Sequence, residues 1–396
     1  MRIAFAAAYD PRDVGNWSGS PSFMIRALEE VGATVDVVGP LPEHRPLLQM
    51  GRKVAHRAVG RRHLPDRDPR VLAQWAQELE QRLAGSAADA ILSPSTTPVS
   101  HLRSERPIVV WTDATFGALV GFYPEFSNLS RSSVRNGRRQ EEAALARVDL
   151  AVFSSQWAAD GARDAYGVSE DRLEVVPFGA NIEAPPAAEV TARIEARTQD
   201  RCRIVFIASD WFRKGGDVAV EAVGLLNEAG VPAEITLIGA QPPRGEKLPA
   251  YARYLGSVDK RSATGADRIG DLIGDAHFLL LPTRADCTPV VFAEASAWGT
   301  PSIAPDVGGV GEMVVDGANG RLLECPAGPE EYASAMSAAF RDPAGYRELA
   351  LSSRREYDRR LNWTTAGKTV VRLIADVMAK PAKPAGSGRA AAGTSS

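Results

Sequence analysis

The chain has 396 residues, of which 44% are apolar, and this is enough for two hydrophobic cores because single cores stop growing near about 250 to 300 residues. The formal net charge of -3 excludes a globally basic nucleic-acid-binding protein. Three scattered cysteines, Cys202, Cys287 and Cys325, form no CxxC pair, which excludes a disulfide framework and a cysteine zinc motif and favours a cytoplasmic location.

Short apolar runs alternate along the chain with segments of helical period. Such runs are typical of buried parallel strands that are covered by helices on both faces. The first run is too short for a signal peptide or a membrane span, so we interpret it as a buried strand. The predicted strands are residues 3–9, 34–38, 90–93, 108–111, 150–153, 173–176, 203–208, 234–238, 253–255, 278–281, 301–304 and 321–323.

This alternation predicts two doubly wound α/β domains. A Pro- and Ala-rich change of composition at residues 177–188 indicates the linker, so we assign residues 1–183 and 184–361 to the two domains. A helix is expected at 362–379. Its spacing fits either domain, and we assign it to the first. Residues 380–396 are rich in Pro, Gly, Ala and Ser without apolar periodicity, and they are expected to be disordered.

Two adjacent cations, Arg213 and Lys214, follow the predicted strand 203–208 and precede Gly215-Gly216 and a helix. This position is the carboxyl edge of a parallel sheet, where open α/β sheets bind ligands. Arg can hold two oxygens at once and Lys acts as a compact charge, so the pair suits a diphosphate. The alternative is a solvated basic turn.

A second motif runs from Ala285 to Glu312. It places Asp286 and Glu294 eight positions apart, and the pair Gly308-Gly309 then precedes another helix. Carboxylates accept hydrogen bonds from sugar hydroxyls, and a glycine turn at a helix N-terminus offers N–H groups to phosphate. The combination indicates a nucleotide sugar as the ligand.

These motifs resemble those of the retaining glycosyltransferases of family 4. The family signature is two glutamates separated by seven residues, then G-T-P, then a Gly-Gly turn. Here it reads D-C-T-P-V-V-F-A-E from Asp286, G-T-P from Gly299 and G-G from Gly308, and P-F-G-A-N from Pro177 matches the interdomain segment. The resemblance implies the GT-B fold, in which two doubly wound Rossmann-like domains have parallel sheets that face across a cleft.

The resemblance also implies residue roles. Arg213 and Lys214 should neutralise the pyrophosphate, and Glu294 should accept hydrogen bonds from the ribose hydroxyls. Backbone N–H groups of Gly308 and Gly309 should approach the diphosphate. The backbone facing the donor sugar should be that of Thr288, Pro289 and Val290.

Asp286 stands where the family has its first glutamate, which usually binds a donor-sugar hydroxyl. Because its side chain is shorter by about 1.5 Å, either the loop moves inward or the contact differs. The alternative role is an N-cap for the following helix.

In the first half, Gly19 lies in a loop that approaches the donor phosphate and the acceptor in this family, although it could be a plain turn glycine. Asp113 lies where many members have a histidine. It could act as the partner or base of the acceptor hydroxyl, or as a helix cap.

The triplet Asp66-Arg67-Asp68 matches a cation-binding signature of a different glycosyltransferase fold. Asp68-Pro69 is instead typical of a helix start, so we expect neither a metal nor another cofactor. Residues 51–63 concentrate basic side chains in an amphipathic stretch. This stretch could contact anionic lipid at the inner membrane face, grip an acidic acceptor or form a solvated loop.

The predicted function is therefore that of a retaining hexosyltransferase. It would move a sugar from a nucleoside-diphosphate sugar to a hydroxyl of a glycan, a small molecule or a lipid-linked acceptor. Two alternatives remain: a sugar-nucleotide epimerase or hydrolase on the same fold, and a non-catalytic scaffold that binds nucleotide sugars.

Overall fold

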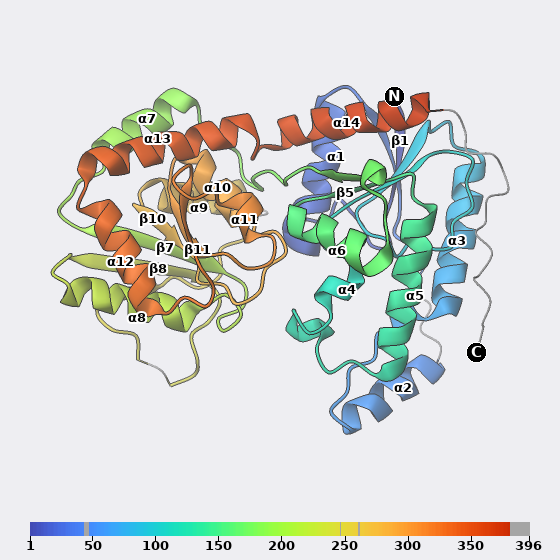
Figure 1. Ribbon diagram of the computed structural model, residues 1–396, viewed down its shortest axis with the longest axis horizontal. Helices are drawn as coiled ribbons and strands as arrows, with labels where there is room; N and C mark the ends of the chain where they lie inside the picture. The colour runs from blue at the N-terminus through green and yellow to red at the C-terminus, as the bar shows by residue number, and fades with distance from the viewer. Residues whose placement is uncertain (43–46, 246, 260–261, 381–396) are drawn as a thin grey trace.

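The computed structural model describes residues 1–42, 47–245, 247–259 and 262–380. Residues 381–396, which make up almost all of the predicted tail, lie outside the described part. The described chain forms two lobes side by side, each with a parallel sheet between helices (Figure 1). This arrangement confirms the predicted α/β class with two doubly wound domains.

Each lobe contains a six-stranded sheet in which every pairing between neighbouring strands is parallel. The first has the order β2-β1-β3-β4-β5-β6 and consists of β1 (Arg2–Ala6), β2 (Thr34–Val38), β3 (Ala90–Ser93), β4 (Ile108–Thr112), β5 (Leu150–Phe153) and β6 (Leu173–Val175). The second has the order β12-β11-β10-β7-β8-β9 and consists of β7 (Cys202–Ala208), β8 (Ala233–Gly239), β9 (Ala252–Tyr254), β10 (Phe278–Leu280), β11 (Ser302–Pro305) and β12 (Gly320–Leu323). Each predicted strand overlaps one of these.

Helices cover both faces of each sheet. Those between the strands of the first sheet are α1 (Ser20–Glu30), α2 (Leu47–Ala58), α3 (Pro69–Ala84), α4 (Phe116–Leu119), α5 (Arg131–Arg147) and α6 (Gln156–Tyr166). In the second lobe they are α7 (Ala187–Ala196), α8 (Gly216–Glu228), α9 (Ala263–Gly274), α10 (Val291–Ala297), α11 (Val310–Met313), α12 (Pro329–Phe340) and α13 (Pro343–Arg359).

The core of the first lobe follows the two-residue period of its strands. Along β1, Ile3 and Phe5 pack into one cluster, whereas Ala4 and Ala6 pack into the cluster on the opposite face. Both faces of the first sheet are therefore buried. This explains why its strands appear in the sequence as continuous apolar runs rather than as alternating apolar and polar residues.

The last helix, α14 (Trp363–Ala379), returns from the second lobe and packs on the first (Figure 1). Its apolar side, which includes Trp363 and Ile374, joins the core cluster that contains Phe5. A Cβ on Gly367 would lie 2.7 Å from the Ala27 carbonyl oxygen, so glycine is what lets α14 approach α1 so closely. The chain thus crosses between the lobes twice.

Candidate active site

The predicted cationic pair lies in the turn between β7 and α8. The Arg213 backbone N–H donates to Oδ1 of Asp210 at 2.8 Å, and Gly215 precedes α8 with a φ of 76°. A Cβ on Gly215 would lie 2.1 Å from the Pro282 carbonyl oxygen, so glycine is needed for this close approach to the segment after β10. The turn therefore presents Arg213 and Lys214 at the carboxyl edge of the second sheet.

Asp286 lies beside this turn and is only 4% exposed. Its Oδ2 forms an ion pair with Nζ of Lys214, and its Oδ1 lies 3.9 Å from Nη1 of Arg213. The Tyr123 hydroxyl donates to Oδ1 at 3.3 Å and accepts from the Cys287 backbone N–H at 2.9 Å. Asp286 is thus a buried carboxylate that fixes the direction of the lysine ammonium.

Tyr123 reaches this site from the first lobe, and the sequence analysis did not identify it. The Arg213 guanidinium lies over its ring, 4.7 Å from the ring centroid. Burial, together with the charge of Asp286, raises the pKa of Tyr123, so its hydroxyl stays protonated and can donate. The aromatic pair Phe122-Tyr123, between α4 and α5, was the available sequence signal for this residue, but its partner Asp286 lies more than 160 residues away along the chain.

Neither candidate aspartate caps a helix, so that alternative is wrong for both. The N-cap residue of α10 is Val290, and no side chain there accepts a hydrogen bond from the first backbone N–H groups of the helix. At α4 the cap is Thr115, whose side chain accepts from the Ala118 backbone N–H at 3.3 Å. The side chains of Asp286 and Asp113 are therefore left for contacts in the site.

The glycine pair after β11 is packed directly against the Asp286 loop. A Cβ on Gly308, which has a φ of 59°, would lie 2.2 Å from the Asp286 carbonyl oxygen, and one on Gly309 would lie 1.8 Å from that of Cys287. The Gly309 N–H donates to the Asp286 carbonyl at 3.0 Å. This differs from the expected role of Gly309, because its amide joins the two loops and does not point at a ligand.

The remaining predicted residues of the second lobe lie on the loop and helix that follow Asp286. The Thr288 hydroxyl contacts the Ser154 hydroxyl at the end of β5, and Val290 packs against the core of the first lobe. Glu294 is fully buried in the first turn of α10. Residues 288–290 therefore lie where the two lobes meet.

Gly19 ends a loop of unusual backbone conformation. Trp17, Ser18 and Gly19 have φ angles of 50°, 55° and 87°, so three successive residues are left-handed. Non-glycine residues in this region are strained and persist only where the surroundings hold them. Here Nδ2 of Asn181 donates to the Ser18 carbonyl at 2.8 Å, and Nε1 of Trp363 donates to Oδ1 of Asn181 at 2.9 Å.

Asp113 follows β4 and faces the second lobe. Burial raises the pKa of Asp113 to about 7; the negative charge of Asp286 acts in the same direction, whereas a hydrogen bond with the Trp17 side chain opposes it. The structure therefore brings the two candidate carboxylates, one from each lobe, close enough to influence each other.

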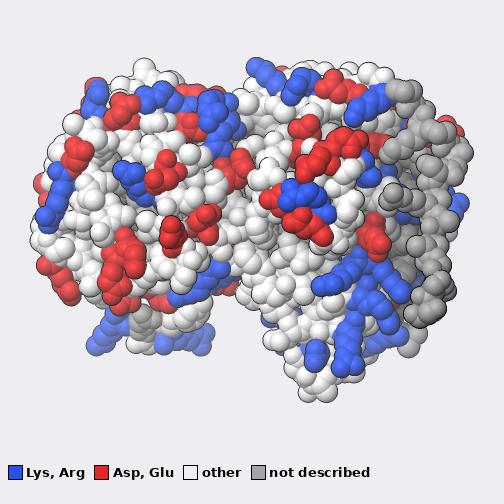
Figure 2. Space-filling model, viewed as in Figure 1, with Lys and Arg blue, Asp and Glu red and all other residues white. Residues whose placement is uncertain are grey.

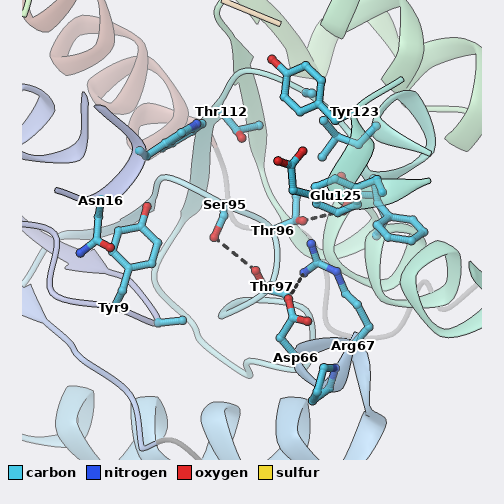
Figure 3. Close-up of a pocket in the computed structure, with 18 of the residues that line it drawn as sticks. Tyr9, Asn16, Asp66, Arg67, Ser95, Thr96, Thr97, Thr112, Tyr123 and Glu125 are labelled. Atoms are coloured by element: carbon cyan, nitrogen blue, oxygen red, sulfur yellow. Dashed lines mark hydrogen bonds and ion pairs between the residues drawn. The ribbon is translucent and has the colours of Figure 1, made fainter. Parts of the chain in front are cut away.

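A cavity of about 910 Å³ opens beside these residues in the first lobe. Arg213, Tyr123 and Asp113 line it toward the second lobe. Figure 3 shows Tyr9 and Asn16 on one side, Arg67 and Asp66 on the other, and the hydroxyls of Ser95, Thr96 and Thr97 at the back. Of the two predicted diphosphate-binding cations, Arg213 thus lines a cavity of ligand size, and Lys214 lies next to it in the chain, paired with Asp286.

Two family models match this chain. "Glycosyltransferase Family 4" matches residues 23–184, and "Glycosyl transferases group 1" matches residues 201–342, so the two together span most of both sheets. The chain belongs to the family 4 glycosyltransferases.

Two curated relatives of this glycosyltransferase are D-inositol 3-phosphate glycosyltransferases. The D-inositol 3-phosphate glycosyltransferase of Xylanimonas cellulosilytica is 29% identical over 251 residues, which is 59% of this chain and 58% of the relative. The D-inositol 3-phosphate glycosyltransferase 1 of Catenulispora acidiphila is 26% identical over 351 residues, 81% of each chain. The match to the first relative thus covers less than two thirds of that protein.

Solved structures share the fold of the glycosyltransferase at low identity. Sucrose-phosphate synthase from Thermosynechococcus elongatus has a TM-score of 0.67 and 18% identity, covering 96% of this chain and 99% of that one. Anabaena Alr3699/HepE in complex with UDP-glucose has a TM-score of 0.60 and 16% identity, covering 95% and 100%. These likenesses confirm the GT-B architecture.

Within the described ranges, the glycosyltransferase has no group of three or more His, Cys, Asp or Glu side chains that could hold a metal ion. The Asp66-Arg67-Asp68 triplet lies at the start of α3. The Asp68 carboxylate accepts from the Arg70 backbone N–H at 2.9 Å with Pro69 as the next residue, which is the predicted capping arrangement.

The predicted basic stretch 51–63 includes most of α2 and the turn after it. Met50, Val54 and Val59 are exposed there beside basic side chains, and Figure 2 shows further Lys and Arg side chains gathered over α5. Among the described residues, no helix has the length and apolar character needed to cross a bilayer. Contact of this stretch with anionic lipid stays a prediction, which co-sedimentation with phosphatidylglycerol vesicles would test.

Proposed function

We propose that this protein is a retaining hexosyltransferase that moves a sugar from a nucleoside-diphosphate sugar to an acceptor hydroxyl. The observation that carries the proposal is the cluster beside the cavity. Lys214 and Asp286 of the second lobe form an ion pair there, Asp286 accepts from Tyr123 of the first lobe, and Arg213 and Asp113 line the cavity itself. The second lobe, residues 184–361, would hold the donor. The first, residues 1–183 with the helix 362–379, would hold the acceptor.

The cationic pair would do most of the catalytic work. Negative charge grows on the diphosphate as the glycosidic bond breaks, and fixed cations aimed at that charge lower the barrier. Lys214 is buried and oriented by Asp286, so it needs little reorganisation when the charge develops. Glu294 would accept the ribose hydroxyls, and the backbone of residues 288–290 would face the donor sugar.

Retention of configuration follows from the family resemblance. The departing phosphate would take the proton of the acceptor hydroxyl on the face where the new bond forms, so no protein nucleophile is required. Asp113 would accept a hydrogen bond from the attacking hydroxyl. Closure of the two lobes around the donor would exclude bulk water and so limit wasteful hydrolysis of the donor.

Donor choice is the direct test. UDP-, GDP- and ADP-glucose should be compared by thermal shift of the full chain, because a ligand present at 100 times its Kd stabilises the fold by about 2.7 kcal/mol. We expect a uridine nucleotide to give the shift, since Anabaena Alr3699/HepE was solved with UDP and UDP-glucose. If none of the nucleotides stabilises the chain, the donor proposal is wrong.

The same preparations separate the alternatives. A transferase consumes donor only when an acceptor is present, whereas a hydrolase or epimerase consumes it without one. A non-catalytic scaffold binds nucleotide and shows no turnover with any acceptor of a broad sugar, cyclitol and lipid-linked panel.

Turnover should depend on pH near neutrality. If the charged Asp113 accepts from the acceptor hydroxyl, kcat should rise between pH 6 and 8 with a midpoint of about 7, the pKa to which burial raises Asp113. Asp113→Asn should remove this rise and lower kcat. A flat wild-type profile over this range would contradict the role.

The stability of the protein should fall with rising pH, whereas its turnover should increase. The pKa of Asp113 is raised in the folded state, so the folded chain binds this proton more tightly than the unfolded chain. The contribution of Asp113 to the free energy of unfolding is therefore greatest at low pH and is lost as the pH rises from about 4 to about 7. Urea unfolding at pH 5 and pH 8 should show a smaller difference in the Asp113→Asn variant than in the wild type.

A further inference from the structure

Tyr123 belongs to the first lobe, but its side chain contacts charged groups of the second lobe that the proposed transfer step uses. Its hydroxyl donates to Oδ1 of Asp286 at 3.3 Å and accepts from the Cys287 backbone N–H at 2.9 Å. The Arg213 guanidinium lies over its ring, 4.7 Å from the ring centroid. One side chain thus contacts both the carboxylate and one of the two cations of the proposed diphosphate site.

The neighbouring residue Phe122 holds the Tyr123 ring in place. The two rings are stacked, with centroids 5.5 Å apart and an interplanar angle of 14°. The Phe122 ring also packs against Trp157 of α6, at a centroid distance of 5.1 Å, and a Cβ on Gly308 would lie 2.8 Å from it. Phe122 therefore fills the space beside the glycine turn of the second lobe and fixes Tyr123 where the lobes meet.

The two oxygens of Asp286 have different partners. Oδ2 pairs with the Lys214 ammonium, whereas Oδ1 accepts from the Tyr123 hydroxyl. Nη1 of Arg213 lies 3.9 Å from Oδ1, which is too far for a hydrogen bond, and donates instead to the Ala285 carbonyl at 2.8 Å. The carboxylate therefore neutralises Lys214 more closely than it neutralises Arg213.

The Tyr123 hydroxyl keeps the second oxygen of Asp286 from binding Arg213. A carboxylate and a guanidinium readily form parallel hydrogen bonds, so without this hydroxyl Oδ1 would accept from Arg213. The guanidinium would then direct its donors to Asp286 and not to a ligand. With Tyr123 present, Arg213 lines the cavity with a planar fork that suits phosphate oxygens.

The phosphate that Arg213 would meet is the one that bears the sugar. In the proposed reaction the sugar must face the acceptor, which the first lobe would hold. Arg213 lines the cavity of that lobe, so it lies on the side from which the acceptor hydroxyl would attack. The negative charge that develops as the sugar departs would appear first on this phosphate.

We propose that Tyr123 is a positioning residue of the donor site, which acts through Asp286 to leave the Arg213 charge available to the sugar-bearing phosphate. The inference rests on the proposed function, because it names a residue of the first lobe that completes the donor site of the second. This arrangement of charges requires the two lobes to be in contact. The electrostatic stabilisation of the leaving group therefore depends on the contact between the lobes.

The test compares nucleoside diphosphates with monophosphates, which lack the terminal phosphate. The probes are UDP and UMP, GDP and GMP, and ADP and AMP, each titrated by calorimetry into the full-length wild type and Tyr123→Phe. This variant keeps the ring over which Arg213 lies and removes the hydroxyl. We expect it to bind the diphosphate of the recognised base about 10-fold more weakly and to bind the monophosphate as the wild type does. A merely structural role would weaken both.

A double-mutant cycle tests whether Tyr123 acts through Asp286. In an Asp286→Asn background, which removes the negative charge that Tyr123 holds, Tyr123→Phe should change the diphosphate affinity by less than about 2-fold. Tyr166→Phe, in the same lobe, is the matched control. Its hydroxyl packs against Gly117, where an added Cβ would lie 2.9 Å from it, and its removal should change neither affinity.

The inference and the proposed function fail with different results. If the wild type binds no diphosphate more tightly than the matching monophosphate, there is no diphosphate site and both are wrong. The inference alone is wrong if the wild type prefers the diphosphate and Tyr123→Phe keeps that preference. It is also wrong if the 10-fold loss persists in the Asp286→Asn background, or if the variant loses affinity for the monophosphate to the same extent.

Discussion

Replacing Lys214 by methionine is expected to lower kcat by about 100- to 1000-fold, the usual effect of removing one oriented electrostatic contact from a transition state. The ammonium is buried and held by Asp286, so solvent cannot replace it when charge develops on the leaving diphosphate. The kcat of the variant and of the wild type should be measured by steady-state kinetics with the donor that the thermal-shift experiment identifies. Lys368→Met, on the exposed side of α14, is the control and should behave as the wild type.

Loss of stability must be separated from loss of catalysis in this variant. Removing Lys214 leaves Asp286 buried without its nearest cation, and breaking a buried ion pair in this way costs about 3 kcal/mol or more. The double variant Lys214→Met with Asp286→Asn should recover part of that free energy of unfolding without recovering kcat. Near-normal turnover in either variant would remove Lys214 from the mechanism.

Replacing Gly309 by alanine should have the second largest effect. The new Cβ would lie 1.8 Å from the Cys287 carbonyl oxygen, which no real Cβ contact allows, so the two loops must separate. We expect a loss of about 1 to 3 kcal/mol in the free energy of unfolding. Because Asp286 lies on the displaced loop and orients Lys214, affinity for the nucleotide should fall at least 10-fold.

Gly311→Ala is the matched control for this prediction. Gly311 lies two residues further on in α11, and its added Cβ would lie 3.1 Å from a carboxylate oxygen of Asp306 and 3.7 Å from Cδ2 of Leu322, which are both side-chain atoms. A side chain that can rotate gives way more easily than backbone, so stability and nucleotide binding should stay close to wild type. If both alanine variants behave alike, the close approach of Gly309 is not what holds the loop.

Much of this architecture could be predicted because it depends on local pattern. Continuous apolar runs indicated the strands of both sheets. The predicted strand 203–208, followed by the Gly215-Gly216 helix start, predicted that Arg213 and Lys214 lie at the edge of a sheet. The structure places both residues there. The motif from Asp286 to Gly309 indicated one site, and its loops are indeed in contact.

The parts that could not be predicted depend on which side chains meet across the two lobes. Tyr123 contacts Asp286 over a separation of 163 residues, and no local period encodes such a meeting. The Gly309 amide donates to the neighbouring loop, and the helix α4 is capped by Thr115 instead of Asp113. Both contacts follow from backbone geometry that composition does not specify.

The carboxamide of Asn181 connects the two places where the chain passes from lobe to lobe. It belongs to the outgoing passage, it accepts from Trp363 at the start of the returning one, and it holds the carbonyl of Ser18 in the left-handed loop. Any hinge rotation must therefore either carry that loop along or break these bonds. The wall of the cavity, which includes Trp17, is in this way tied to the angle between the two lobes, so a change in that angle would also change the shape of the cavity beside Asp113.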